Sequence, residues 1–175
     1  SYLINTASYI QVDKAEEEPE KAFLINAAAV KNMCDICIKL DLPLLHLSTD
    51  YVFSGNADKP YTESDEAMPQ GVYGISKLAG EQVIQYRLEK YYIVRVSGLY
   101  GAAGPMGKSW NFVDFIVKKA RQGGPLNVVD DQCLTPTYTR DLAEKILGLL
   151  QTDHYGLFHM SHSGECTWHR FAEEI

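Results

Sequence analysis

Several features that mark other protein classes are missing or scarce in this sequence of 175 residues. No apolar run reaches the roughly 20 residues that a membrane-spanning helix needs, so we expect no transmembrane segment. Basic residues are outnumbered, with 16 Lys and Arg against 23 Asp and Glu and a formal net charge of −7, which argues against a dedicated nucleic-acid-binding protein. No basic and apolar leader opens the chain, and we expect a cytoplasmic protein.

Cysteine is also scarce, with four residues in the whole chain. Cys34 and Cys37 have the C-x-x-C spacing found in redox and zinc sites, but no second pair follows at zinc-ribbon spacing. Both lie within an apparent helix and share a face with apolar neighbours. We therefore predict buried free thiols in a reducing cytosol. The histidines near the end of the chain match no metal-binding spacing either, and we predict no metal site.

The third absence is a glycine-rich phosphate loop of the G-x-x-G-x-x-G type. Strand and helix patterns nevertheless alternate along the chain, which predicts an α/β fold built on a parallel sheet. The same alternation predicts helices on both faces of that sheet, a doubly wound arrangement. The expected strands cover residues 2–4, 42–47, 92–96, 127–129 and 157–160, and the expected helices cover residues 22–40, 71–86, 111–122, 140–150 and 167–175.

Small polar residues follow three of the expected strands. They are Asn5, the turn 48–50 and the turn 97–98. Ligands of open α/β sheets bind at the carboxyl ends of the strands, so these turns should line one edge that holds the site.

A tyrosine and a lysine in the segment YGISK carry the most specific chemistry. Tyr73 and Lys77 are four residues apart, which places both on one face of a helix. A free phenol has a pKa of about 10, and a nearby ammonium group is expected to lower it so that the phenol can give a proton to a carbonyl oxygen. Thr49 can orient that oxygen with its hydroxyl. Gly74 and Gly80 keep the helix slim and permit close approach of another segment.

Longer segments strengthen this interpretation. INTASYIQVDKAEEEP, LSTDYVFSG, PYTESDEAMPQGVYGISKLAGEQ, VVDDQ and TPTYTRDLA cover much of the chain. With them, the sequence resembles the extended short-chain dehydrogenases/reductases, and within these the dTDP-4-dehydrorhamnose reductase family. The resemblance implies reduction of the 4-keto group of a dTDP-linked deoxyhexose with NADPH or NADH. The implied substrate is a small nucleotide sugar, and a homodimer is conceivable within this family.

The resemblance also implies individual roles. The implied catalytic residues are Thr49, Tyr73 as proton donor, and Lys77 as its electrostatic partner and ribose ligand. The implied cofactor contacts are Ala7, Ser8, Tyr9 and Lys77, and the implied substrate contacts are Val12, Asp50 and Gly98. For Thr49 and Asp50, a turn-capping role is the alternative, and packing is the alternative for the loop at Tyr9. Some relatives use a divalent cation such as Mg²⁺ at a dimer interface, but these residues offer no ligand set for it.

Two positions depart from the family pattern. Gly98 stands where the family usually has a tryptophan, and Leu134 stands where it tends to have a glycine. Because the glycine-rich phosphate loop is missing, the resemblance further implies a Rossmann-like, doubly wound parallel sheet that is truncated at its N-terminus. It implies a partial NAD(P)-binding and catalytic domain with substrate-lobe insertions over residues 1–150, and the start of a C-terminal substrate-binding region over residues 151–175. Two alternatives stay open: another nucleotide-sugar epimerase or reductase, and a non-catalytic regulatory subunit similar to the methionine adenosyltransferase beta subunit.

Overall fold

A computed structural model describes residues 1–102 and 111–175 of the chain. These residues form two compact units, which we describe one at a time. The first unit comprises Ser1–Val96 and His154–His159, and the second comprises Ser97–Asp153 and Met160–Ile175.

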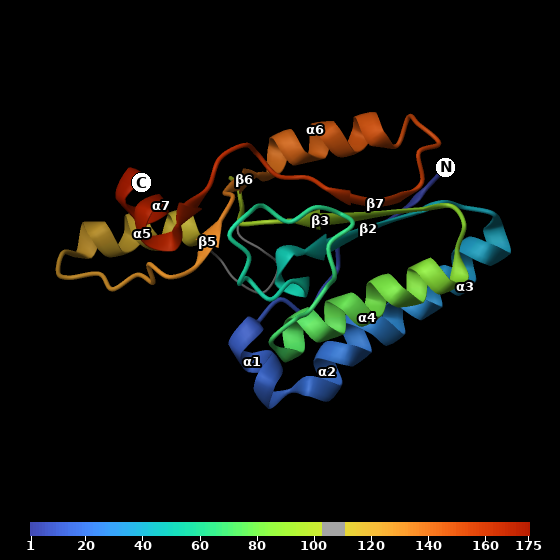
Figure 1. Ribbon diagram of the computed structural model, residues 1–175, viewed down its shortest axis with the longest axis horizontal. Helices are drawn as coiled ribbons and strands as arrows, with labels where there is room; N and C mark the ends of the chain where they lie inside the picture. Colours follow the sequence, from blue (N-terminus) through green and yellow to red (C-terminus); the bar gives the residue numbers. More distant parts are fainter. Residues whose placement is uncertain (103–110) are drawn as a thin grey trace. The chain divides into compact units, whose positions relative to one another are not determined.

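The first unit is built on a four-stranded parallel sheet, as predicted (Figure 1). Its strands run in the order β1-β2-β3-β7. Their bounds are β1, Leu3–Asn5; β2, Leu44–Thr49; β3, Tyr91–Val96; and β7, Gly156–His159. The two central strands are almost entirely buried and consist of apolar residues with few interruptions, the pattern that parallel strands covered on both faces require.

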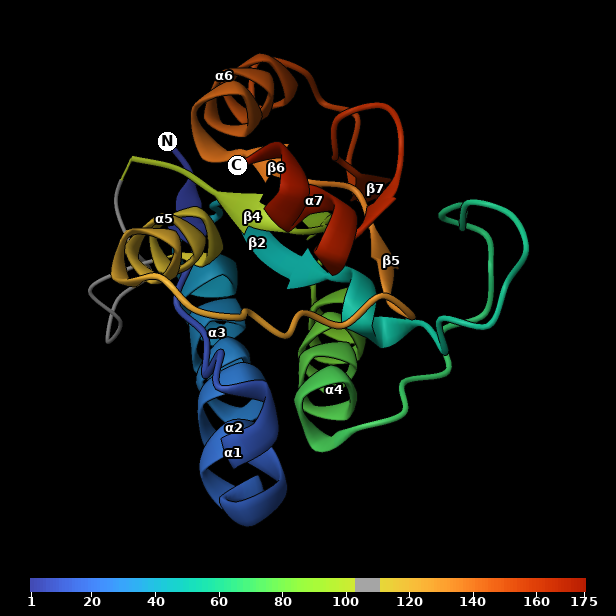
Figure 2. The ribbon, with the colours of Figure 1, turned by 90° about the vertical axis from the view of Figure 1, so that its left-hand side faces the viewer.

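The helices of the first unit connect these strands. They are α1, Val12–Glu17; α2, Pro19–Phe23; a π-helical segment, Leu24–Ala28; α3, Ala29–Leu40; and α4, Val72–Arg87. α3 and α4 lie side by side, and Figure 2 looks along them. Val30, Cys34 and Cys37 of α3 pack with Ile84 of α4 against the central strands. Both cysteines are free and buried, and burial raises the pKa of Cys34 to about 11, which confirms the interpretation as buried thiols.

The close approach predicted for α4 is present at two glycines. A Cβ atom on Gly74 would collide with the carbonyl oxygen of Tyr51, and one on Gly80 would collide with the carbonyl oxygen of Asn26. The absence of side chains at these positions therefore lets the π-helical segment and the turn after β2 reach the backbone of α4.

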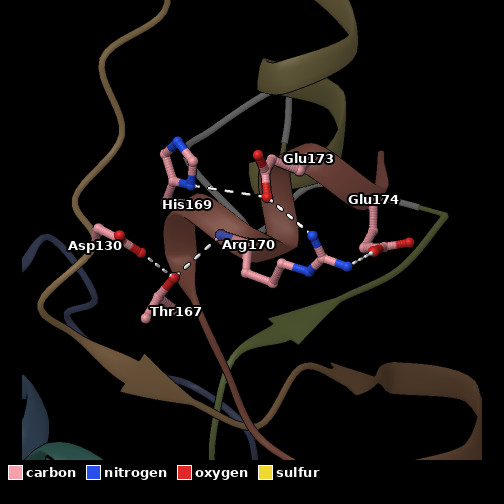
Figure 3. Close-up of polar contacts among 6 residues, drawn as sticks. All are labelled: Asp130, Thr167, His169, Arg170, Glu173 and Glu174. Atoms are coloured by element: carbon pink, nitrogen blue, oxygen red, sulfur yellow. Dashed lines mark hydrogen bonds and ion pairs between the residues drawn. The ribbon is translucent and has the colours of Figure 1, made fainter.

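The second unit contains short strands and three helices. Its strands pair as β4, Leu99–Tyr100, with β6, Thr137–Tyr138, and as β5, Cys133–Leu134, with β8, Cys166–Thr167. Its helices are α5, Phe112–Gln122; α6, Thr139–Leu149; and α7, Trp168–Glu174. Thr167 is the N-cap of α7, because its Oγ1 atom accepts a hydrogen bond of 3.1 Å from the backbone N–H of Arg170 (Figure 3).

Two sequence-based assignments are wrong. Residues 127–129 do not form a strand; Val129 instead accepts a backbone hydrogen bond from His169. The sequence also predicted one helix from residue 22, whereas helical structure begins at Val12, and Leu24–Ala28 is a π-helical segment. A short segment such as Asn127-Val128-Val129 can signal a strand, but it forms one only when a neighbouring strand lies at pairing distance.

Candidate active site

The first unit brings most of the predicted site residues to the carboxyl ends of β1 and β2. The loop after β1 carries Ala7, Ser8 and Tyr9, and β2 ends at Thr49. Tyr73 and Lys77 lie on the first two turns of α4, one turn apart. Gly98 belongs to the second unit and is described with it below.

The Tyr73 phenol lies near two hydroxyl groups, those of Thr49 and Ser8. Hydrogen bonds with them act to lower the pKa of Tyr73, but burial outweighs them and raises that pKa to about 12. The nearby Asp50 carboxylate acts in the same direction as burial. The direction is opposite to the one expected from the sequence, because burial has the largest influence on this pKa.

Lys77 is almost completely buried, at 1% exposure. Its Nζ atom donates a hydrogen bond of 2.6 Å to the carbonyl oxygen of Leu47 and lies 3.2 Å from Nε2 of His46. Burial lowers the pKa of Lys77 to about 8, and the charge of Glu81 acts against that shift. A lysine with such a pKa exchanges its proton near neutral pH, which suits a group that takes part in proton transfer.

Thr49 also has the capping role that we considered as the alternative. Its Oγ1 atom accepts a hydrogen bond of 3.2 Å from the backbone N–H of Tyr51 and donates one of 3.1 Å to Oδ1 of Asp50. It thereby begins the short 3₁₀ turn Asp50–Val52. The hydroxyl is thus held in place by the same turn that carries Asp50.

The loop after β1 is positioned by Asn26. The helix around Asn26 is among the segments that resemble the family, but the sequence suggested no role for this residue. Its Oδ1 atom accepts hydrogen bonds from Oγ of Ser8 at 2.9 Å and from the backbone N–H of Tyr9 at 2.8 Å. Its Nδ2 atom donates to Oγ of Ser76 in α4 at 2.9 Å. Asn26 lies in the π-helical segment, and such segments are frequent at functional sites. The available signal was a polar residue on the otherwise apolar face of a predicted helix.

Tyr9 and Val12 differ in their surroundings. The Tyr9 side chain is buried with Ala15 and Ala22, and its hydroxyl donates a hydrogen bond of 2.9 Å to Glu18. Its ring therefore has a packing role, whereas its backbone is held beside Ser8. Val12 is the first residue of α1 and is partly buried.

A buried ion pair lies beside these residues. Arg95 of β3 binds Glu81 of α4 with an Nη2 to Oε2 distance of 2.7 Å, and both residues are at most 6% exposed. The hydroxyl of Ser48 donates to the same carboxylate. Glu81 is one turn beyond Lys77, so this pair fixes α4 against the end of β2 from which Thr49 projects.

In the second unit, Gly98 has a left-handed backbone with φ of +54°. A Cβ atom at this position would lie 2.6 Å from Cδ1 of Leu134 and 3.0 Å from the carbonyl oxygen of Thr135. The two positions that depart from the family pattern are therefore in contact with each other, and the larger side chain of Leu134 occupies the space that a residue larger than glycine at position 98 would need.

The described part of the chain contains no group of three or more His, Cys, Asp or Glu side chains arranged to hold a metal ion. Within the same residues, no helix is long and apolar enough to cross a membrane.

Comparisons with known proteins identify relatives of the chain. The spore coat polysaccharide biosynthesis protein SpsK of Bacillus subtilis is 38% identical over 173 residues, which cover 99% of this chain and 59% of that protein. The dTDP-4-dehydrorhamnose reductase of Escherichia coli is 38% identical over 175 residues, which cover 97% of this chain and 57% of that protein. The chain thus spans less than two thirds of the length of these relatives.

Solved structures show the same likeness. The dTDP-4-dehydrorhamnose reductase of Bacillus anthracis, solved in complex with NADP, has a TM-score of 0.92 at 38% identity over 98% of this chain and 59% of that one. The dTDP-glucose 4,6-dehydratase DesIV of Streptomyces venezuelae, at 20% identity over 99% of this chain and 56% of that one, has a TM-score of 0.87 and shares the Rossmann-like fold. The family described as RmlD substrate binding domain matches residues 1–175, and the chain belongs to this family.

Proposed function

We propose that the full-length protein carrying this chain is a dTDP-4-dehydrorhamnose reductase. It would reduce the 4-keto group of dTDP-4-dehydro-L-rhamnose to dTDP-L-rhamnose in the biosynthesis of cell-surface polysaccharides. The observation that carries the proposal is the hydrogen bond between the hydroxyls of Tyr73 and Thr49 at the end of β2, with Lys77 one turn further along α4 and bound to Leu47 of the same strand. Relatives at 38% identity that bear this enzyme's name support it.

Tyr73 is the proposed proton donor. Its pKa of about 12 keeps the phenol protonated at neutral pH, so the proton is available when the carbonyl oxygen gains negative charge. Thr49, whose hydroxyl lies beside the phenol, would donate a hydrogen bond to the same oxygen. Lys77 would stabilise the phenolate that remains after proton transfer, and the pKa of the phenol would then fall.

The cofactor site is proposed along the loop after β1. Ala7, Ser8 and Tyr9 would contact the dinucleotide through backbone and hydroxyl groups, and Lys77 would bind ribose hydroxyls. The residues fit such a ligand, because Ala7 is exposed and Asn26 holds the hydroxyl of Ser8 and the backbone N–H of Tyr9 in place. When bound, NADPH or NADH supplies the hydride that reduces the carbonyl carbon. The NADP complex of the Bacillus anthracis relative favours NADPH.

The sugar site of the first unit is proposed to include Val12 and Asp50. Gly98, in the second unit, stays a predicted substrate contact. The exposed face of the Asp50 turn offers a carboxylate to sugar hydroxyls. Gly98, which has no side chain and lies against Leu134, favours a sugar contact different from that of relatives with a large residue there. We also propose a cytoplasmic location, because the free and buried Cys34 and Cys37 suit a reducing compartment. The homodimer stays a prediction.

Turnover of the purified full-length protein tests the proposal. We expect NADPH absorbance to fall when a dTDP-4-keto-6-deoxyhexose is added, and Tyr73→Phe to lower kcat by about 10²- to 10⁴-fold. Tyr86→Phe is a matched control, because Tyr86 lies on the same helix with 90% of its side chain exposed, and it should keep full activity. Activity in Tyr73→Phe equal to that of the wild type would contradict the assignment. Binding of the nucleotide without turnover would favour a regulatory subunit instead.

A further inference from the structure

Three buried polar side chains lie in a row beneath the proposed site, one from each of three elements. Asn5 ends β1, His46 is its direct neighbour on β2, and Lys77 comes from α4. Nδ2 of Asn5 lies 2.8 Å from Nδ1 of His46, and Nε2 of His46 lies 3.2 Å from Nζ of Lys77. All three residues are at most 3% exposed, so no bulk water competes for these contacts.

The orientation of the Asn5 amide decides which nitrogen of His46 carries the proton. Oδ1 of Asn5 accepts a hydrogen bond of 3.0 Å from the backbone N–H of Ala7, so the group facing His46 is the amide nitrogen. An amide nitrogen can only donate, and Nδ1 of His46 must therefore be the acceptor. A neutral imidazole with an accepting Nδ1 carries its hydrogen on Nε2. His46 is neutral, because burial, the largest influence on this group, holds its pKa well below the ordinary value.

The Nε2–H group of His46 points at Lys77, and this constrains the charge of the lysine. An ammonium group has three donors and no acceptor, so it cannot form a hydrogen bond with another N–H group. A neutral amine has one lone pair and can accept from Nε2–H of His46 while it donates to the carbonyl oxygen of Leu47 at 2.6 Å. Every hydrogen bond in this row is therefore formed only when Lys77 is uncharged. The groups involved are the N–H of Ala7, the amide of Asn5, the ring of His46, the amine of Lys77 and the carbonyl of Leu47.

We propose that Asn5 and His46 form a docking position for the uncharged amine of Lys77, which makes His46 a positioning residue of the reductase. When Lys77 gains a proton, its ammonium group meets the N–H of His46 and loses this contact, so the charged side chain is released toward Tyr73 and the cofactor. Protonation and position of Lys77 are thereby coupled. The functional meaning of this coupling rests on the function proposed above, whereas the docking position itself does not.

The other groups that face Lys77 fit this arrangement. From α4, Glu81 is the neighbouring charge, and it favours the ammonium form. Its carboxylate is bound by Arg95 of β3 and Ser48 of β2, which limits that effect. From β2, His46 contributes no charge at neutral pH. The lowered pKa of Lys77, about 8, has the direction that a dock for the neutral amine requires.

Nuclear magnetic resonance on the full-length protein without cofactor tests the dock directly. Nitrogen-15 labelling of histidine should show the proton of neutral His46 on Nε2. Carbon-13 labelling of lysine, with the Lys77 signal identified by its loss in Lys77→Met, should show Lys77 titrating near pH 8. In His46→Gln, whose side-chain oxygen can accept from an ammonium group, the pKa of Lys77 should rise by about one unit or more.

The matched control is His159→Gln. His159 is partly buried on β7 of the same sheet, and its substitution should leave the titration of Lys77 unchanged. Two results would overturn the proposal: a proton on Nδ1 of His46, or a Lys77 pKa that is the same in His46→Gln and in the wild type. The position of the His46 proton is measured on the wild-type protein, so this result tests the proposal even if His46→Gln does not fold. A protein without reductase turnover that still shows both expected signals would contradict the proposed function and leave the dock intact.

Discussion

The buried ion pair of the first unit and the exposed ion pairs of α7 in the second unit differ in what they hold together. In the first unit, Arg95 and Glu81 are buried and belong to elements separated along the chain, β3 and α4. In the second unit, Arg170 pairs with Glu173 and Glu174 of its own helix, three and four residues away, and these side chains are more than half exposed (Figure 3). The Arg95–Glu81 pair therefore holds two distant elements together, whereas the ion pairs of Arg170 stay within a single helix.

This difference predicts where substitutions are costly. A buried charge that loses its partner cannot be hydrated, whereas an exposed charge exchanges its partner for water at little cost. The proposed catalytic residues lie among the buried groups of the first unit. The same contacts that stabilise that unit should therefore also position its reactive side chains.

Loss of the buried ion pair should have the largest effect. Arg95→Met leaves Glu81 buried without its cation and should lower the free energy of unfolding by about 3–5 kcal/mol. Arg170→Met in α7, whose partners are exposed, should change it by about 1 kcal/mol or less. Urea unfolding of the two variants measures the contrast. An equal loss of unfolding free energy in both variants would contradict the contrast between buried and exposed pairs. Recovery of stability in Arg95→Met/Glu81→Leu would show that the unpaired Glu81 carboxylate causes the loss.

A substitution at Gly98 tests whether the packing of Leu134 against this glycine contributes to the stability of the second unit. Gly98→Ala combines a left-handed backbone with a collision against Leu134 and should cost about 2–4 kcal/mol. Gly123→Ala has a similar φ of +71° but nothing within 4 Å, and should cost only about 1 kcal/mol. Thermal unfolding compares them. If Leu134→Ala does not reduce the cost of Gly98→Ala, the contact with Leu134 is not its cause.

The buried lysine should give the first unit a characteristic pH dependence. The folded-state pKa of Lys77 is lowered to about 8 from 10.5, so between these values the unfolded chain binds more protons than the folded one. Stability contributed by this group therefore rises with pH, by up to about 1.4 kcal/mol per pH unit. Tyr73 has the opposite sign but acts only above pH 10.

Unfolding by urea from pH 7 to 9.5 isolates this contribution as the difference between wild type and Lys77→Met. The difference should grow in favour of the wild type as the pH rises through 8. Lys118→Met, which removes an exposed lysine of α5 in the second unit, provides the control and should run parallel to the wild type. A constant difference between Lys77→Met and wild type would show that Lys77 keeps its ordinary titration when folded.

The smallest effect is expected at the cap of α7. Thr167→Ala removes the hydrogen bond to the backbone N–H of Arg170 and should cost about 1 kcal/mol. Thr167→Ser keeps the accepting oxygen and should cost less. Circular dichroism during thermal unfolding would measure both. A cost well above that of one cap would mean that the contact between Thr167 and Asp130 carries tertiary stability, contrary to the local character assigned to α7.

The sequence predicted most of the sheet and the longer helices, for local reasons. Apolar runs that end in small polar residues predicted β2 and β3, and spacing of apolar residues predicted α4 within one residue at each end. The strand expected at residues 127–129 is absent because pairing depends on a neighbour that local pattern does not reveal. The π-helical segment was missed for a similar reason, since it follows from contacts that Asn26 makes with distant residues.

The proposed catalytic residues were found from sequence, whereas their supporting residues were not. Thr49, Tyr73 and Lys77 belong to segments with a recognisable pattern. His46 is a single polar residue in an apolar strand, and nothing near it in the chain indicates that Asn5 and Lys77 are its partners. Those contacts join residues 41 and 31 positions apart and exist only in the folded protein.

The sequence by itself determined that Tyr73 and Lys77 share a helix face, because residues four positions apart are neighbours on any α-helix. Tertiary structure alone decided their protonation. Burial raises the pKa of the phenol and lowers that of the amine, since a low-dielectric interior disfavours the charged form of each. The spacing is a property of the chain, but the solvent excluded around these two groups is a property of the fold.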